Sequence, residues 1–254
     1  MKKKGKSATD IGLNRSGIAT SPVEAKRLIE GAEKLTPDAS LPADPAMARM
    51  RMEYTAEAEP VGTMPPPASL RGVASTALQA LKGNKANVLL DKLGERLAFE
   101  RTGVRLYDAA MAKLAATGSW EGGPSLEDLK EIREDEFSHF RMLSELIETM
   151  GADPTVMTPC ADVAAVASSG VIKVLSDPRT NAAQALEALL IAELTDVDGW
   201  SMLIDLTESA GMKKSADKMR EALLAEEGHL SRVRGWLKVR TAAEASRELE
   251  PAAP

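Results

Sequence analysis

The sequence predicts an all-α protein built around a four-helix bundle with one long crossover connection. Of its 254 residues, 44% are hydrophobic and only 3% are aromatic, and the abundance of Ala, Leu, Glu and Lys favours helix over sheet. After about residue 86, apolar residues recur at alternating steps of three and four in four long segments. This is the period of one helix face. The connections between these segments are short, long and short.

The starts and ends of the predicted helices are marked by capping and breaking residues. The first segment stops at "TGSWEGGPS", where glycines and a proline interrupt the pattern. Ser125 is a suitable N-cap for the second segment, with Asp128 three residues on, and Gly151 is suited to end it. The third begins near Asn181, and the fourth follows the turn "SAGMKKS". Each segment is long enough to be one helix of the bundle.

The long connection between the second and third helices determines the predicted topology. It spans about 30 residues, which is unusual for a structureless loop in a compact domain. A crossover along the bundle would explain this length, since the second and third helices would then run parallel. The stretch "DVAAVASSGVIKVL" is expected to form a short helix within the crossover. The two short loops make their helices antiparallel neighbours.

Outside the predicted bundle of residues 86–240, both ends of the chain have a different composition. Residues 1–85 contain two short helical patterns, "SPVEAKRLIEGAEKL" and "DPAMARMRMEYTAEAE", followed by the proline-rich linker "EPVGTMPPPAS". We expect a largely disordered N-terminal extension with short helices. Two interpretations stay open, a mobile tail or an arm that folds on a protein partner. Residues 241–254 are expected to form a C-terminal tail.

Composition also excludes several classes of protein. The net charge of −6 argues against a general nucleic-acid binder. No stretch approaches the length of an uninterrupted apolar membrane span, and the N-terminal lysines precede no apolar signal region. The single cysteine, Cys160, excludes an intramolecular disulfide and a four-cysteine zinc or rubredoxin-like site. We therefore expect a cytoplasmic protein with no nucleic acid and no membrane among its partners.

Each predicted helix carries one glutamate on its apolar face, and two of them add a histidine three residues later. Residues three apart share a helix face, so each Glu–His pair points the same way. A lone buried carboxylate is costly, and four in one core would repel one another. Two divalent cations would offset that repulsion, and carboxylate with imidazole suits iron or manganese. The candidate metal ligands are Glu100, Glu136, His139, Glu193, Glu226 and His229.

The pattern is more specific than either pair alone. With 38 acids in 254 residues, both histidines would have an acid three residues before them roughly one time in fifty by chance. The two halves of the bundle also correspond to each other. Tyr107 follows Glu100 by seven residues, and Trp200 follows Glu193 by the same step. The large aromatic residues two turns from each single glutamate are consistent with a duplicated helix pair.

With this ligand set, the chain from about residue 86 to 240 resembles the ferritin-like di-iron carboxylate superfamily, which includes ferritins, bacterioferritins and rubrerythrins. That group takes one Glu from each of two helices and Glu-x-x-His from each of the other two. "LAFERTGVRLYDA" also resembles the family's first helix, where a tyrosine follows the ligand glutamate by two turns. The resemblance implies two iron ions that react with O2 or H2O2. It also implies Tyr107 as a redox-active, catalytic neighbour of the metals.

The resemblance leaves the metal and the reaction open. A dimanganese catalase-like enzyme would use the same ligands, and a non-catalytic iron-binding bundle that docks to a partner is a further alternative. Residues 1–85 are not part of a standard ferritin subunit, which argues against a storage cage. We expect a homodimer or a higher homo-oligomer instead.

Several other residues are expected to support the site or to lie outside it. Asp196, three residues after Glu193, is expected to orient a ligand histidine, and Asp135 is a second candidate for that role. Trp200 is expected to be a packing residue. The acids away from the apolar faces are expected to face solvent: Glu95, Glu134 and Glu227.

Overall fold

The computed structural model describes residues 45–58 and 85–248. The first short helix predicted in the N-terminal extension, the proline-rich linker and the last six residues lie outside the described residues. The chain forms two units, residues 1–59 and 60–254. In the first unit, α2 (Pro45–Glu57) confirms the second of the predicted short helices. The described side chains of α2 are all exposed.

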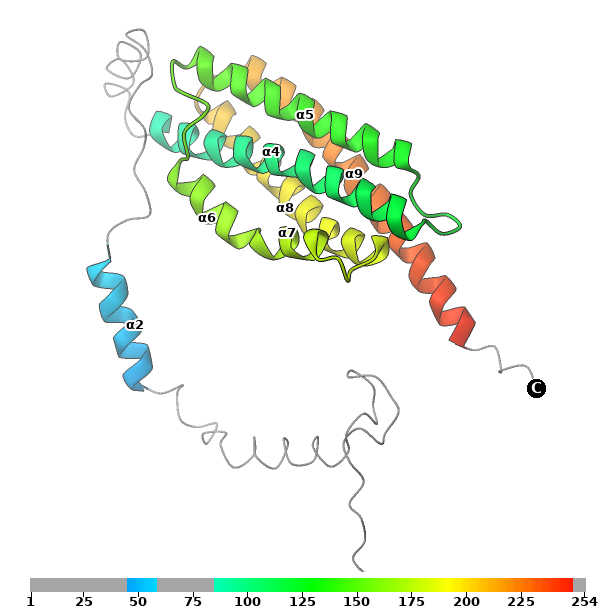
Figure 1. Ribbon diagram of the computed structural model, residues 1–254. Coiled ribbons are helices and arrows are strands. Elements are labelled where there is room, and N and C mark those ends of the chain that lie inside the picture. Colours follow the sequence, from blue (N-terminus) through cyan, green and yellow to red (C-terminus); the bar gives the residue numbers. More distant parts are fainter. Residues whose placement is uncertain (1–44, 59–84, 249–254) are drawn as a thin grey trace, which may run out of the picture. The chain divides into compact units, whose positions relative to one another are not determined.

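The second unit contains the predicted four-helix bundle. Its long helices are α4 (Lys85–Thr117), α5 (Leu126–Thr149), α8 (Ala182–Ser209) and α9 (Lys213–Glu248). Helix α4 packs mainly against α5 and also contacts α8, and α8 packs mainly against α9 (Figure 1). The described residues contain no strand. The all-α fold class is therefore confirmed, and α9 continues beyond residue 240, where the bundle is expected to end.

The helix boundaries follow the capping signals of the sequence. The Ser125 side chain accepts a hydrogen bond from the Asp128 backbone N–H, and the Asp128 carboxylate accepts one from the Ser125 backbone N–H. Asn181 and Gln184 form the same reciprocal pair at the start of α8. After α5, Gly151 takes a φ of 84°, which glycine adopts without a steric cost. These local contacts set the lengths of the helices independently of the core.

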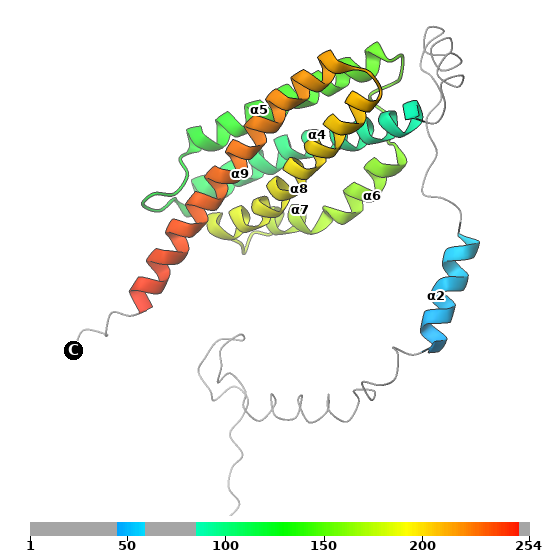
Figure 2. The same cartoon turned by 180° about the vertical axis from the view of Figure 1, so that it is seen from behind.

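The crossover runs along α4 and α8, on the side of the bundle away from α5 and α9 (Figures 1 and 2). It contains two short helices, α6 (Pro159–Ala167) and α7 (Ser169–Ser176). Its start is tied to α4 by Asp91, whose backbone carbonyl accepts a hydrogen bond from the Thr158 hydroxyl at 3.0 Å. Its end is tied to α4 by Lys113, which donates to the Thr180 carbonyl at 3.0 Å. Helices α5 and α8 therefore run parallel, as predicted.

Among the described residues, no single helix is long and apolar enough to cross a membrane. Helices α6 and α7 pass that test only as a pair, by length and composition, with a bend of 44° between them.

The core of the bundle consists of two apolar clusters along the helix axes. One contains Leu89, Leu93 and Leu97 of α4, and the other contains Leu106 and Leu114 of the same helix. Both clusters recruit buried residues from the facing helices. The segment of α4 between them carries a buried glutamate, so a polar layer lies in the middle of the bundle between two apolar ones.

Candidate metal centre

All six predicted ligands lie in this polar layer, and all are buried. They come from the four long helices, and the exposed fraction of each is at most 8%. Three sets of three residues offer ligand atoms that lie within 4.8 Å of one another: Glu100 with His139 and Glu226, Glu136 with Glu226 and His229, and Glu100 with Glu136 and Asp196. The bundle thus brings five of the six predicted ligands into these sets. Glu193 belongs to none of them, and metal binding by all six residues stays a prediction.

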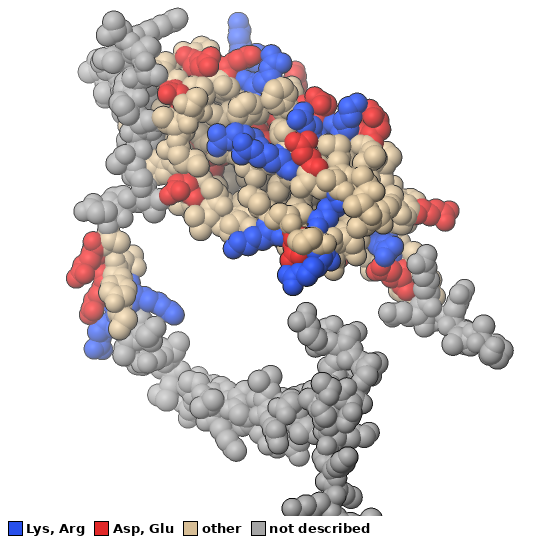
Figure 3. All heavy atoms as spheres, viewed as in Figure 1, with Lys and Arg blue, Asp and Glu red and all other residues tan. Residues whose placement is uncertain are grey.

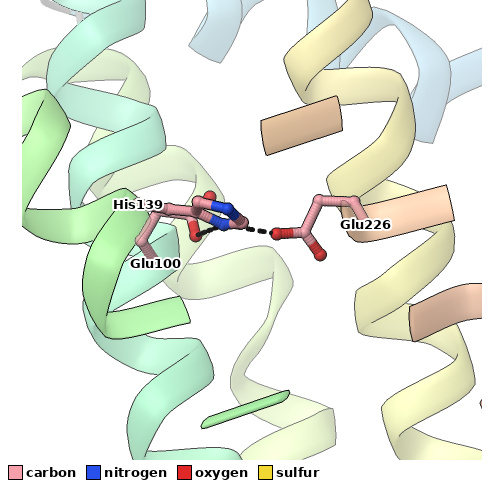
Figure 4. Close-up of side chains that lie close together, drawn as sticks. All are labelled: Glu100, His139 and Glu226. Carbon is pink, nitrogen blue, oxygen red and sulfur yellow. Dashed lines mark ion pairs between the residues drawn. The ribbon is translucent and has the colours of Figure 1, made fainter. Parts of the chain in front are cut away.

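Glu226 occupies the centre of the layer because a histidine faces each of its two oxygens. His139 Nδ1 lies 2.7 Å from Glu226 Oε1 and 3.6 Å from Glu100 Oε2 (Figure 4). His229 Nδ1 lies 2.9 Å from Glu226 Oε2. A carboxylate shared in this way between two imidazoles stands where a bridging ligand between two cations would stand.

The second ring nitrogen of His229 faces outward to Asp135. His229 Nε2 lies 3.1 Å from Asp135 Oδ2, and the Asp135 side chain is half-exposed. An outer carboxylate of this kind fixes the orientation of a ligand imidazole and its tautomer. The structure therefore gives Asp135 the contact expected of an orienting residue, and the role itself stays a prediction.

The expectation that Asp196 orients a histidine is wrong. Its carboxylate pairs with the buried Arg96, whose Nη1 lies 3.0 Å from Asp196 Oδ1 and also donates to the Asp196 carbonyl at 3.2 Å. Arg96 Nε lies 3.1 Å from Glu100 Oε1. The guanidinium carries a full charge and lies at ion-pair distance from Asp196, so it is the partner of this aspartate. Glu100 therefore has one oxygen toward Arg96 and the other toward His139.

Two glycines make room for these side chains. A β-carbon at Gly103 would overlap the Glu136 carboxylate and lie 2.6 Å from its Cδ. A β-carbon at Gly199 would overlap the Arg96 guanidinium and lie 3.2 Å from its Cζ. The absence of a side chain at these two positions lets Glu136 and Arg96 reach the polar layer.

Arg96, Gly103 and Gly199 were missed by reasoning from the sequence. Two signals were available. Arg96 lies four residues before Glu100, on the same helix face. Each glycine lies inside a predicted helix, where it costs roughly 0.5–1 kcal/mol relative to alanine, which points to a close approach by another group.

Tyr107 and Trp200 flank the layer from opposite helices. Tyr107 of α4 is buried, and its hydroxyl donates a hydrogen bond to the Glu193 carboxylate of α8. Trp200 of α8 is fully buried and meets the ring of His139 edge to face, with 5.6 Å between ring centroids. Tyr107 thus contacts a predicted ligand directly, and its catalytic role stays a prediction.

Neighbouring charges and burial shift the pKa values of the buried acids and histidines. Burial favours the neutral form of Glu226, but contacts with His139 and His229 hold its pKa at about 2. Burial disfavours the charged form of His139, yet Glu100 and Glu226 raise its pKa to about 9. Burial, and next the charge of Glu226, raises the pKa of Glu193 to about 8. Cations that enter this layer would therefore displace protons.

The buried atoms of the layer fit cations. One oxygen of Glu136 and one of Glu193 have no hydrogen-bond partner among the described residues. Buried polar atoms are hydrogen-bonded in the great majority of cases. Acceptors without donors, together with two imidazoles in one small volume, are what a pair of cations would satisfy.

Comparisons with known proteins found one family model and one solved structure that are similar to this chain. A family model described as a ferritin-like domain matches residues 91–241, more than half of the chain. A crystal structure of ferritin-like, diiron-carboxylate proteins from Bacillus anthracis aligns with 61% of this chain and 99% of its own, at 17% sequence identity and a TM-score of 0.46. No curated protein matches the sequence.

Proposed function

Because the chain belongs to the ferritin-like family, we propose that the buried layer holds two iron ions and oxidises Fe(II) with O2 or H2O2. The observation that carries this proposal is the position of Glu226, with one histidine at each of its oxygens. In this proposal Glu136 and Glu226 would help to hold both ions. Glu100 and His139 would also hold one of them, and Glu193 and His229 the other.

The charges of the side chains support two divalent ions. Four glutamates supply four negative charges, which match the four positive charges of two ferrous ions. The remaining buried pair, Arg96 with Asp196, is neutral as a unit. When bound, iron supplies the redox step by passing between its ferrous and ferric states. The protein residues hold the ions close together and keep water out with the apolar clusters on both sides.

We assign Tyr107 to the reaction because its hydroxyl contacts a proposed ligand. The hydrogen bond to Glu193 holds that carboxylate in place. Burial and the charge of Glu193 raise the pKa of Tyr107 well above its usual value, so the phenol stays protonated. If Glu193 held iron, a protonated phenol at this position would be placed to supply a proton and an electron during the oxidation.

Metal content is the direct test of the proposal. Protein expressed with added iron, or with added manganese, would be analysed by mass spectrometry for bound metal. We expect about two irons per chain in the wild type and loss of metal in Glu136→Ala/Glu226→Ala. The matched control is Glu134→Ala/Glu227→Ala, which removes the same charge from exposed positions of the same two helices.

Two further outcomes separate the alternatives. Addition of O2 or H2O2 to the ferrous protein should produce a near-ultraviolet absorption increase that is absent from the double variant without Glu136 and Glu226. Two manganese ions in place of iron, with O2 released from peroxide, would favour the catalase-like alternative. A wild type without bound metal would contradict the whole proposal.

A further inference from the structure

We propose that a cavity between α4, α6 and α8 binds a small, uncharged, mostly apolar organic molecule, and that Arg96 links this site to the metal ligand Glu100. The coupling half of this inference rests on the proposed function, since it needs metal at Glu100. The binding half does not.

The cavity has the size and lining of a small-molecule site. Its volume is about 500 Å³, and such sites have volumes of roughly 300–1,000 Å³ with mostly apolar walls. Its apolar wall residues are Val88, Phe99, Leu194, Met202, Leu203 and Leu206.

The cavity is deep. Met202 is 66% exposed and lies at its mouth, whereas Leu203 and Arg96 are only 3% and 4% exposed and form its floor. It therefore extends from the surface toward the polar layer of the bundle. A flat protein face would not fill this depth, so we assign the cavity to a small molecule rather than to a second copy of the chain.

Its floor is shared with the metal centre. Arg96 lines the cavity, and the same guanidinium lies 3.1 Å from Glu100 and 3.0 Å from Asp196. Gly199, another lining residue, has no side chain and so leaves the space that the Arg96 guanidinium occupies. The ring of Phe99 packs against the same guanidinium, with 4.1 Å between Arg96 Cζ and the ring centroid. A molecule in the cavity would press on the side chain that holds one oxygen of Glu100.

The charges around the cavity select against an anionic ligand, since Glu95 and Asp198 also line it. Both cations of the wall are already paired, Lys92 with Glu95 at 2.7 Å and Arg96 with Glu100 and Asp196. An anion would therefore find carboxylates nearby and no cation without a partner. Any ion would also lose its hydration against the apolar wall, which is costly. An uncharged molecule avoids both costs.

The binding test uses two fluorescent probes of similar shape and different charge. Full-length protein would be titrated with N-phenyl-1-naphthylamine, which is uncharged, and with 8-anilinonaphthalene-1-sulfonate, its anionic counterpart. We expect saturable binding of one uncharged probe per chain, at least about tenfold tighter than the anion.

Thr195→Phe tests the location of the probe, because Thr195 lines the cavity and a phenyl group there would fill part of it. We expect this variant to weaken the uncharged probe about tenfold or more. The matched control is Thr241→Phe. Thr241 is an exposed helical residue outside the cavity, and its hydroxyl donates to the backbone carbonyl four residues earlier, as the Thr195 hydroxyl does.

The inference would be overturned by equal binding to Thr195→Phe and the wild type, or by tighter binding of the anionic probe. Affinity for the uncharged probe that falls as protein concentration rises would also overturn it, because a second copy would then cover the cavity.

The coupling is tested with Co2+ as the metal. We expect the uncharged probe to shift the visible absorption bands of the Co2+-loaded wild type and to leave those of Thr195→Phe unchanged. Probe binding without a shift would contradict the link through Arg96. Failure of Co2+ to bind at all would instead contradict the proposed metal centre, so the two failures are distinguishable.

Discussion

Replacement of Gly103 by alanine should separate the stability of the bundle from its capacity to bind metal. The new β-carbon would lie 2.6 Å from Glu136 Cδ, whereas carbon atoms in contact lie about 3.5–4.0 Å apart. The carboxylate must therefore retreat by roughly 1 Å. Metal–ligand distances tolerate only about 0.2 Å, so Glu136 would be lost as a bridging ligand.

The two expected effects differ in size. The retreating group is the end of a flexible side chain, and alanine is favoured over glycine in a helix by roughly 0.5–1 kcal/mol. The free energy of unfolding of the metal-free protein should therefore stay within about 1 kcal/mol of the wild type. Affinity for at least one ion should fall about 100-fold or more, since even the loss of an outer contact costs 10–100-fold.

Equilibrium dialysis against Mn2+, with metal analysis, and denaturant unfolding of the metal-free protein measure these two quantities. The control is Gly228→Ala on α9, where an added β-carbon has no neighbour within 4 Å. That variant should bind two ions as the wild type does. If Gly103→Ala also binds two ions with wild-type affinity, Glu136 is not a ligand in the position that the structure gives it.

Three further predictions concern the surroundings of the site. Asp135→Ala should weaken metal binding about 10–100-fold, because His229 loses its outer partner; Asp135→Asn, which can still accept a hydrogen bond, should weaken it less, and equal losses would contradict an orienting role. The metal-free protein should become less stable as pH rises from 6.5 to 9, by about 1.4 kcal/mol per pH unit from His139 over this whole range and by a similar amount from Glu193 only up to about pH 8. The pKa of His139 is raised from 6.5 to about 9, so the stabilisation from its charged form is complete below pH 6.5 and is lost as the pH rises to 9. The pKa of Glu193 is raised from 4.5 to about 8, so the cost of ionising this buried acid in the folded state grows between pH 4.5 and pH 8. Denaturant unfolding at several pH values checks this, and constant or rising stability would contradict it. Tyr107→Phe should keep both ions, lower the unfolding free energy by about 1 kcal/mol and slow Fe(II) oxidation in stopped-flow absorption; an unchanged rate would remove Tyr107 from the reaction.

The helices and the inward faces of their polar residues were predictable from local patterns. Ser125 marks the start of α5 and Gly151 marks its end. Each does so through local geometry that involves only residues a few positions away. The i, i+3 spacing of Glu136 and His139 places both side chains on one face whatever that face packs against. The crossover followed from its length alone, because a connection of that size needs its own helices. These features depend on short-range geometry, which the sequence contains directly.

The partners of individual side chains were decided only by the packed bundle. Asp196 shares a helix face with Glu193, and from the sequence it could have faced a histidine or a cation. Its partner, Arg96, lies 100 residues away in the chain. The group that lies about 3 Å from the Asp196 carboxylate is decided by the axial register of α4 against α8. That register is set by the packing of both apolar clusters at once. Periodicity therefore indicates which face a residue occupies, while contacts across the core depend on distances that no single helix determines.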